Sequence, residues 1–267
     1  MNLKTLQNIL LLLSLSLLIS ACSTKNKPSV PMQKSDITKT TNNTSDEFED
    51  EFEEEFKSAD QKVFDPLEGY NRWMTSVNDK FYLYVFDPIS QGYAFVMPKP
   101  ARIGLSNAFD NLKFPIRFTN NLLQFKFDSS MKELGRFMIN STLGVLGLFD
   151  VAKAGGIEPQ DEDFGQTLGY YGVGSGFHVV LPFWGPSNLR DILGLSVDAA
   201  ISPMTNASLK YQIPQNLEQD LGLSALYYTN KNSLHPGEYE SLKKDALDVY
   251  TFFRDSYEQK RAKEIEQ

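Results

Sequence analysis

The spacing of apolar residues restricts the fold of this chain more than any other feature. They recur three and four positions apart along much of the sequence after residue 63, which places them on one helical face. One helix is predicted by Tyr70, Trp73, Met74, Val77, Phe81 and Tyr84. A second is predicted by Leu189, Ile192, Leu193, Val197, Ala200 and Ile201, after Ser187 as N-cap. A third is predicted over residues 130–149, with Ser130 as a possible N-cap. Core helices are expected, so the fold is mainly α.

Two shorter segments and the glycines depart from this scheme. Residues 118–127 are dense in aromatic and aliphatic side chains, and such a face could also lie in a lipid interface. Residues 177–181 form an apolar run that ends at Pro182 and could be a strand. Nine of the seventeen glycines lie between Gly144 and Gly176, so irregular backbone is expected there.

The N-terminus has the features of a secretory signal. Its apolar stretch, residues 9–19, is too short to cross a bilayer. Ile19-Ser20-Ala21-Cys22 resembles the bacterial lipobox, and Cys22 is the only cysteine of the chain. The resemblance implies that residues 1–21 are removed and that Cys22 carries covalent lipid. Beyond this lipid, no cofactor is expected. Two or more acyl chains hold a protein stably on a membrane. The alternative is an ordinary signal with a chance cysteine.

Residues 22–63 are predicted to be a flexible acidic linker, because they are rich in polar residues and cannot bury enough apolar area to fold. Within the linker, Phe48, Phe52 and Phe56 lie four apart among many acids, which would place their rings on one helical face. Residues 46–56 are therefore either a solvated acidic run or a segment that folds on a partner. Residues 64–267 fit one domain.

Composition excludes several functions. The net charge of −8 argues against nucleic-acid binding, and one cysteine with two histidines cannot supply a common zinc centre. The acids Glu158, Asp161, Glu162 and Asp163 lack the spacing of a calcium loop and are expected to form a solvated turn.

Catalytic patterns are incomplete. A lipase elbow around Ser175 would need glycine at position 173, which is Val. A dinucleotide motif that begins Gly172-x-Gly174 would need glycine at position 177, which is Phe. His178 is expected to be hydrogen-bonded and partly buried, and His235 to be solvated. No catalytic or metal residue is assigned, and the chain is not expected to be an enzyme.

Several ordered motifs stand between residues 65 and 261. The first is Asp65-Pro66-Leu67-Glu68-Gly69-Tyr70-Asn71-Arg72. Others are Ser106-Asn107, Asn111-Leu112, Arg136-Phe137, Asn140-Ser141-Thr142, Asp150-Val151-Ala152, Asp163-Phe164-Gly165-Gln166-Thr167-Leu168-Gly169, Leu181-Pro182-Phe183, Gly185-Pro186-Ser187 and Arg190-Asp191. The last set is Asp248, Tyr250, Arg254, Tyr257 and Arg261, in a C-terminal helical pattern. Together these motifs resemble the MlaA/VacJ lipoprotein family across residues 65–261. Gly176-Phe177-His178 stands where the family usually has Gly-Pro-Tyr.

The resemblance implies a ring of amphipathic helices embedded in one membrane leaflet around a central amphipathic channel, with short irregular or strand segments. It implies an outer-membrane lipoprotein, in the periplasmic leaflet of a Gram-negative bacterium, of the intermembrane phospholipid transport system. Such a protein removes mislocalised phospholipid from the outer leaflet and passes it to a periplasmic carrier. A trimeric porin is an expected partner. The alternatives are a structural lipoprotein that scaffolds envelope assembly without moving lipid, and a lipid hydrolase.

Two groups of residues are site candidates. The candidates for a channel wall or gate are Gly144, Gly147, Gly172, Gly174 and Gly176. A bulky change such as Gly147→Trp is expected to lower lipid flux more than stability. The motifs also place cations at Arg72, Arg136, Arg190, Arg254 and Arg261. These arginines are expected in structural ion pairs, and the alternative is phosphate contact at a channel mouth.

Overall fold

The computed structural model describes residues 63–205, 212–244 and 246–267. The described residues all belong to one compact unit, Asp60–Gln267. The predicted signal peptide, Cys22 and the acidic segment 46–56 lie outside the described residues.

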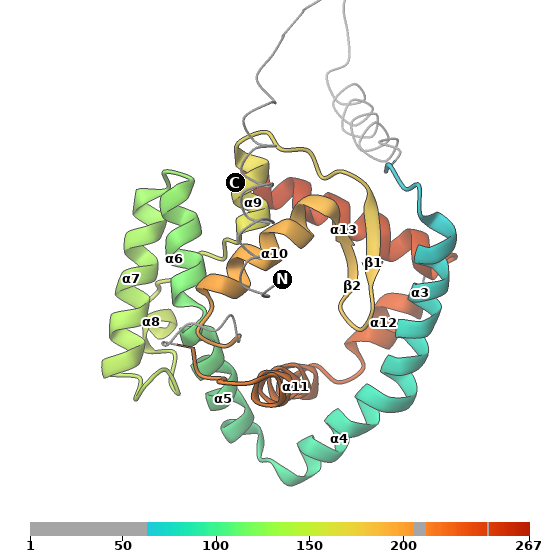
Figure 1. Ribbon diagram of the computed structural model, residues 1–267. Helices are drawn as coiled ribbons and strands as arrows, with labels where there is room; N and C mark the ends of the chain where they lie inside the picture. The colour runs from blue at the N-terminus through green and yellow to red at the C-terminus, as the bar shows by residue number, and fades with distance from the viewer. Residues whose placement is uncertain (1–62, 206–211, 245) are drawn as a thin grey trace, which may run out of the picture. The chain divides into compact units, whose positions relative to one another are not determined.

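The described residues are mostly helical (Figure 1). In chain order the elements are α3 (Glu68–Phe81), the π-helix η1 (Tyr82–Phe86), α4 (Asp87–Val96), α5 (Lys99–Leu112), α6 (Phe114–Leu123), α7 (Phe127–Thr142), α8 (Val151–Ala154), α9 (Phe164–Tyr170), β1 (His178–Leu181), β2 (Gly185–Asn188), α10 (Leu189–Ile201), α11 (Leu217–Leu234), α12 (Glu238–Lys244) and α13 (Val249–Glu266). None of these helices is both long enough and apolar enough to span a bilayer.

The helices of this unit form a closed circuit (Figure 1). α3 continues through η1 into α4, which packs on α11, and α11 packs on α5. α5 then contacts α6, α6 contacts α9, and α9 packs on α13, which returns to α3. α7 pairs with α6, and the two form a helical hairpin joined by a short turn. The predicted mainly α ring with short strand and irregular segments is therefore confirmed.

A two-stranded hairpin lines part of this circuit. β1 pairs antiparallel with β2, with His178 opposite Asn188 and Leu181 opposite Gly185. Asn71 of α3 binds the free edge of β1 as another strand would: its amide donates to the His178 carbonyl at 3.1 Å, and its oxygen accepts from the Val180 N–H at 2.8 Å. The strand predicted over 177–181 is confirmed.

Two predicted helix starts are wrong. Asn188, not Ser187, caps α10, because its side-chain oxygen accepts from the Asp191 N–H at 2.9 Å. Ser130 lies inside α7, where its hydroxyl donates to the Lys126 carbonyl at 3.1 Å. Residue type and position before an apolar run favour serine as a cap. The actual cap is the residue whose backbone is non-helical and whose side chain accepts from the first turn.

The third predicted helix is also too long. α7 ends at Thr142, and residues 143–149 form turns. The chain reverses there because the N–H of Gly147 returns to the Asn140 carbonyl at 2.8 Å. The first predicted helix is confirmed as α3 followed by η1.

The glycine-rich region is only partly irregular, because Gly165 and Gly169 lie inside α9. Asp163 starts this helix with a reciprocal capping box, in which its carboxylate accepts from the Gln166 N–H and the Gln166 side chain accepts from the Asp163 N–H.

Glu162 forms a 2.6 Å ion pair with Lys126 and is largely buried. The predicted solvated turn is thus wrong for Glu162 and Asp163. The exposed members of the cluster are Glu158 and Asp161.

Burial in the described residues is inverted relative to a water-soluble domain. The buried apolar side chains are Met74, Phe109, Ala152, Val180 and Tyr250. The polar side chains with almost no exposure include Asn71, Asn120, Asn121, Gln124, Glu133, His178, Asn188 and Asn230. Conversely, Trp73 is 60% exposed and Tyr84 is 78% exposed. The prediction that the periodic apolar faces form a core is wrong at these positions, because the helices join through polar groups.

The most connected of these joints centres on Arg261 of α13. Its guanidinium binds Asp191 of α10 at 2.9 and 3.0 Å and Asp163 at 2.8 Å, while the Tyr257 hydroxyl donates to Asp191 at 2.6 Å. Burial alone would raise the pKa of Asp191, but hydrogen bonds from Arg261 and Tyr257 hold it below its usual value. The joint therefore keeps a carboxylate ionised between α9, α10 and α13.

We expect Arg261→Ala to lower the free energy of unfolding by about 3–5 kcal/mol, because it leaves the buried Asp191 carboxylate without its main partner. Urea unfolding measures the change. Lys260→Ala is the matched control on the same helix, since Lys260 is exposed, and it should change stability little. Similar losses in both variants would contradict a special role of this joint.

Candidate functional site

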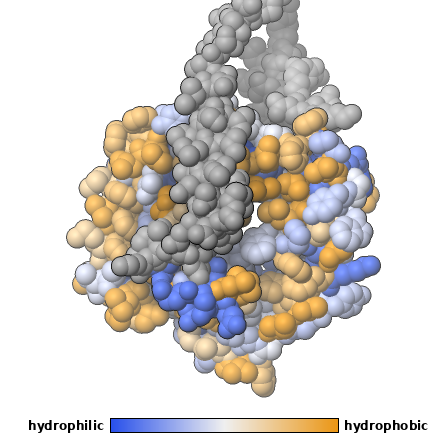
Figure 2. Space-filling model, in the orientation of Figure 1, coloured by the Kyte–Doolittle hydropathy of each residue, from blue (hydrophilic) through white to orange (hydrophobic). Residues whose placement is uncertain are grey.

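Exposed apolar side chains occur on most of the described helices, with one group on the α6–α7 hairpin and another along η1 and α4. On the α6–α7 side they are Leu122, Leu123, Phe125, Phe127, Met131, Met138, Leu143, Val145, Leu146, Leu148 and Phe149. Along η1 and α4 they are Tyr84, Val85, Ile89, Phe95 and Val96. We call these two groups the apolar rim, and Figure 2 shows hydrophobic residues gathered along the α6–α7 side of the unit. An exposed apolar surface of this extent is uncommon on a soluble monomer and indicates contact with lipid or protein.

Polar side chains join the helices behind this rim. At the junction of α6, α9 and α10, Asp198 accepts from the Asn120 amide at 2.9 Å and from the Phe164 N–H at 3.0 Å. At the junction of α4, α5 and α11, the Tyr93 hydroxyl donates to Asn230, whose amide donates to the Arg102 carbonyl at 3.0 Å. Each joint satisfies groups that would be costly to bury alone.

The sequence analysis missed Asn120, Asp198 and Asn230 as functional positions. A signal for them exists, because asparagine is a poor helix former and yet stands inside α6 and α11. Such residues within a helix indicate that the side chain has a partner outside it.

The motif arginines all lie in ion pairs. Arg72 is half-exposed and binds Glu68 at 2.8 Å and Asp248 at 2.6 Å. The pairs of the other four are Arg136 with Asp150 at 2.9 Å, Arg190 with Asp191 at 3.0 Å, Arg254 with Asp255 at 2.7 Å, and Arg261 with Asp191 and Asp163. Phosphate contact at a channel mouth stays a prediction.

The glycine candidates fall into two segments with different surroundings. Gly144 and Gly147 follow α7 and are tightly packed: a Cβ on Gly144 would meet the Phe149 and Asn140 carbonyls, and one on Gly147 would lie 2.6 Å from the Asn111 Cβ. Gly172 and Gly174, between α9 and β1, have open space around them, while Gly176 approaches Leu189. A gate formed by these residues stays a prediction.

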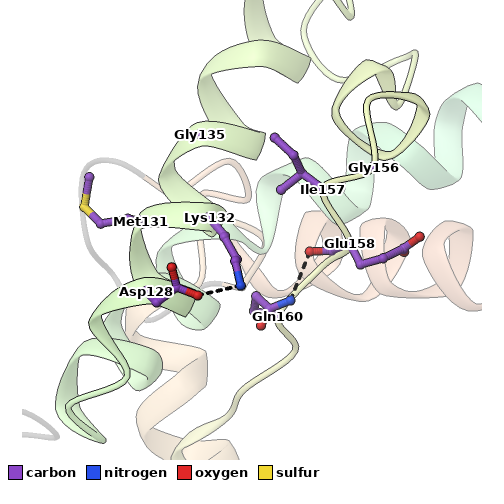
Figure 3. A pocket seen from close by; sticks show the side chains of 8 residues that line it. All are labelled: Asp128, Met131, Lys132, Gly135, Gly156, Ile157, Glu158 and Gln160. Carbon is purple, nitrogen blue, oxygen red and sulfur yellow. Dashed lines mark hydrogen bonds and ion pairs between the residues drawn. The ribbon is translucent and has the colours of Figure 1, made fainter.

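A groove of about 490 Å³ runs between α7 and the loop that follows α8 (Figure 3). It is lined by Asp128, Met131, Lys132, Gly135, Gly156, Ile157, Glu158 and Gln160. Lys132 reaches back to Asp128 at 2.5 Å, and the Gln160 amide donates to the Glu158 carbonyl at 3.2 Å. The groove therefore offers an apolar patch between charges beside the rim.

Each of the two histidines lies within hydrogen-bonding distance of a glutamate. His178 is buried, and its Nδ1 lies 2.9 Å from the Glu258 carboxylate, while its Nε2 has no hydrogen-bond partner. The predicted hydrogen bond is confirmed, with deeper burial than expected. His235 is exposed, as expected, and lies 3.2 Å from Glu238. Within the described ranges, His, Cys, Asp and Glu side chains form no cluster suited to a metal ion.

The fold and its surface define a class of protein: a closed helical ring joined by polar contacts, with many large apolar side chains exposed. The chain belongs to the MlaA lipoprotein family, whose model matches residues 63–264.

Relatives and a solved structure agree with this assignment. The chain is 30% identical over 207 residues to a protein of Rickettsia bellii, covering 77% of this chain and 78% of that one. It is 41% identical over 139 residues to the intermembrane phospholipid transport system lipoprotein MlaA of Shigella flexneri. This match covers 51% of the chain and 55% of the Shigella protein, so it spans little more than half of that relative. A solved structure, described as the structural basis for maintenance of bacterial outer membrane lipid asymmetry, matches with a TM-score of 0.65 and 30% identity, covering 75% of this chain and 98% of the other.

We expect Gly147→Ala to lower the free energy of unfolding by about 1–3 kcal/mol, because Gly147 has a φ of +90° and no room for a Cβ. The packing thus argues against the expectation that a bulky residue there affects lipid flux more than stability. Gly174→Ala is the control, since its surroundings are open, and it should change stability by less than about 0.5 kcal/mol. Chemical unfolding compares the two, and equal stability would contradict the packing argument.

A pH dependence is expected from Asp198, because burial raises its pKa to about 6 despite the hydrogen bonds that it accepts. The folded state then binds a proton that the unfolded state releases near pH 4. Protonation of Asp198 therefore favours the folded state at low pH. As the pH rises through about 6, this contribution to the free energy of unfolding is lost, and the loss is at most on the order of 2–3 kcal/mol. Urea unfolding between about pH 4 and pH 7 should show a smaller decline in Asp198→Asn than in the unaltered protein. Equal slopes would contradict the assignment.

Proposed function

We propose that the chain is an outer-membrane lipoprotein that removes mislocalised phospholipid from the outer leaflet and passes it to a periplasmic carrier, which maintains lipid asymmetry. The observation that carries this proposal is the inverted burial of the ring, with buried polar joints between the helices and the exposed apolar rim. The family assignment and the described role of the matching solved structure support the same reading.

The physical basis is the cost of moving a headgroup through hydrocarbon. A charged group at the bilayer centre costs about 2.5–3.5 kcal/mol even on the mildest scales, and much more on others. A ring that presents apolar side chains to acyl chains and polar groups to its interior lowers that cost. We propose that the ring lies in the periplasmic leaflet and that phospholipid crosses through an amphipathic channel in it.

We propose that Cys22 carries the membrane anchor and that the covalent lipid is the only group added to the chain. Several acyl chains on one residue give stable attachment, and the linker lets the ring settle separately from its anchor. Lipid passage needs no catalytic side chain, so direction and energy come from partners. By resemblance, these are a soluble periplasmic carrier and a trimeric porin.

Deletion of the gene tests the function. Surface phospholipid, measured with a membrane-impermeant amine reagent on intact cells, should increase in the deletion strain and return to normal with the unaltered chain. Cys22→Ala should restore it poorly, because the ring loses its anchor, whereas Ser23→Ala keeps the lipobox cysteine and should restore it fully.

Unchanged surface phospholipid after deletion would contradict the transport function. Full restoration by Cys22→Ala, with the protein still in the outer membrane, would contradict the proposed anchor alone.

A further inference from the structure

The turn between α6 and α7 places an aromatic residue where glycine is usual. Phe125 has a φ of +60° and follows the C-cap of α6. The Phe125 N–H returns to the Leu122 carbonyl at 3.1 Å, and the Lys126 N–H returns to the Asn121 carbonyl at 2.9 Å. These two bonds form a Schellman motif, whose left-handed position normally holds glycine or asparagine.

The turn that follows α7 is more strained. Val145, Leu146 and Gly147 have φ values of +52°, +58° and +90°, so three consecutive residues are left-handed. Left-handed geometry costs an L-residue roughly 1–2 kcal/mol, and it is least tolerated by a β-branched residue such as Val145. Two apolar residues therefore occupy positions where glycine would fit without this cost.

Contacts around the second turn hold the strained backbone in place. The Leu146 N–H returns to the Ser141 carbonyl at 3.1 Å, and the Asn107 amide of α5 donates to the Leu148 carbonyl at 3.1 Å. Strain of this kind persists only where the surroundings determine the conformation, and it is concentrated at functional sites.

The strained side chains do not stabilise the fold by burial. Phe125 is 62% exposed and Leu146 is 79% exposed, and Val145 is also exposed. At these positions the folded chain therefore combines two unfavourable features, left-handed backbone strain and apolar area exposed to water. A partner that covers these side chains would explain why glycine is absent from them.

The position of the two turns favours a lipid bilayer over a protein as that partner. They lie at opposite ends of α7, a helix of 16 residues and thus about 24 Å long. Met131 and Met138 are exposed along the helix between them, and residues 143–149 contain no ionisable side chain. A membrane interface can cover both ends and the helix between them without matching a particular shape or charge.

We propose that the two left-handed apolar turns, at Phe125 and at Val145–Leu146, are paired bilayer anchors that insert into acyl chains and lay the α6–α7 hairpin flat in the interface. This inference rests on the proposed function, since it assumes that the ring lies in a leaflet. It adds which residues insert, and it predicts that stability and membrane binding change in opposite directions when they are replaced.

The test uses the mature chain, residues 22–267, with Cys22→Ala, so that binding to vesicles of phosphatidylethanolamine and phosphatidylglycerol reports the ring without its signal or its anchor. Phe125→Gly and Leu146→Gly should each weaken vesicle binding about tenfold, because each removes a large inserting side chain. Neither should lower the thermal midpoint, since glycine relieves the strain. Leu247→Asn is the control, because Leu247 is fully exposed elsewhere in the ring, and it should bind normally.

A fluorophore gives a second measurement that does not depend on these variants folding equally well. Because Cys22 is the only cysteine, Leu146→Cys in the Cys22→Ala chain takes an environment-sensitive label at one site. Its emission should shift to the blue on vesicles and be quenched by acyl-chain nitroxides. Leu247→Cys, labelled in the same way, should show neither change.

The outcomes separate the two proposals. No vesicle binding by the Cys22→Ala chain would overturn the proposed position in the leaflet. Normal binding with no effect of the glycine variants, an equal loss at Leu247, or a label at position 146 that stays in water would overturn the anchors alone. Glycine variants that bind vesicles normally but lose a co-purifying outer-membrane protein would assign the turns to a protein partner instead.

Discussion

Polar contacts between helices determine the architecture of this ring. Arg261, held by Asp191 and Asp163, joins three helices, and Asp198 joins α10 to α6 and α9. Hydrogen bonds are directional, so they fix the spacing and angle of helices, whereas hydrophobic contact only favours closer packing. Joints of this kind can hold helices in a closed circuit without an apolar centre that draws them together. They also leave the apolar faces of those helices free for the outside.

The apolar rim follows from this arrangement, and so does its cost in water. Side chains such as Phe95 and Tyr84 stay exposed, since the buried apolar cluster of the described residues is small and many helix contacts are made by asparagine, glutamine and charged residues. In a membrane interface the same surface is stabilising. The strained turns follow the same logic, because a residue that is unfavourable in the isolated fold can be favourable in the bilayer. The same side chains therefore affect both the stability of the isolated fold and its binding to a membrane.

The helices and the hairpin strand could be predicted locally, because the period of the apolar residues depends on the chain alone. The caps could not, since Asn188 and Ser187 are equally plausible by type and only the backbone distinguishes them. Residues 143–149 continue the apolar pattern of α7 but form turns, because contacts with Asn140 and with α5 outweigh local propensity. Among the candidate residues, the arginines were correctly expected in ion pairs. Some of their carboxylate partners are neighbours in the sequence, whereas Asp248 for Arg72 and Asp163 for Arg261 come from distant segments, which periodicity does not reveal.

By itself the sequence determined the mainly helical class, the approximate positions of three helices and one strand, and, through Cys22 and the ordered motifs, the family and its expected anchor. These features depend on local residue spacing or on the order of short motifs along the chain. Only the tertiary structure decided which face of each helix is buried. An amphipathic helix has an apolar and a polar face, and the surrounding medium, water or lipid, decides which face is buried. The closing of the circuit by buried asparagines and by Arg261 likewise depends on contacts between residues far apart in the chain.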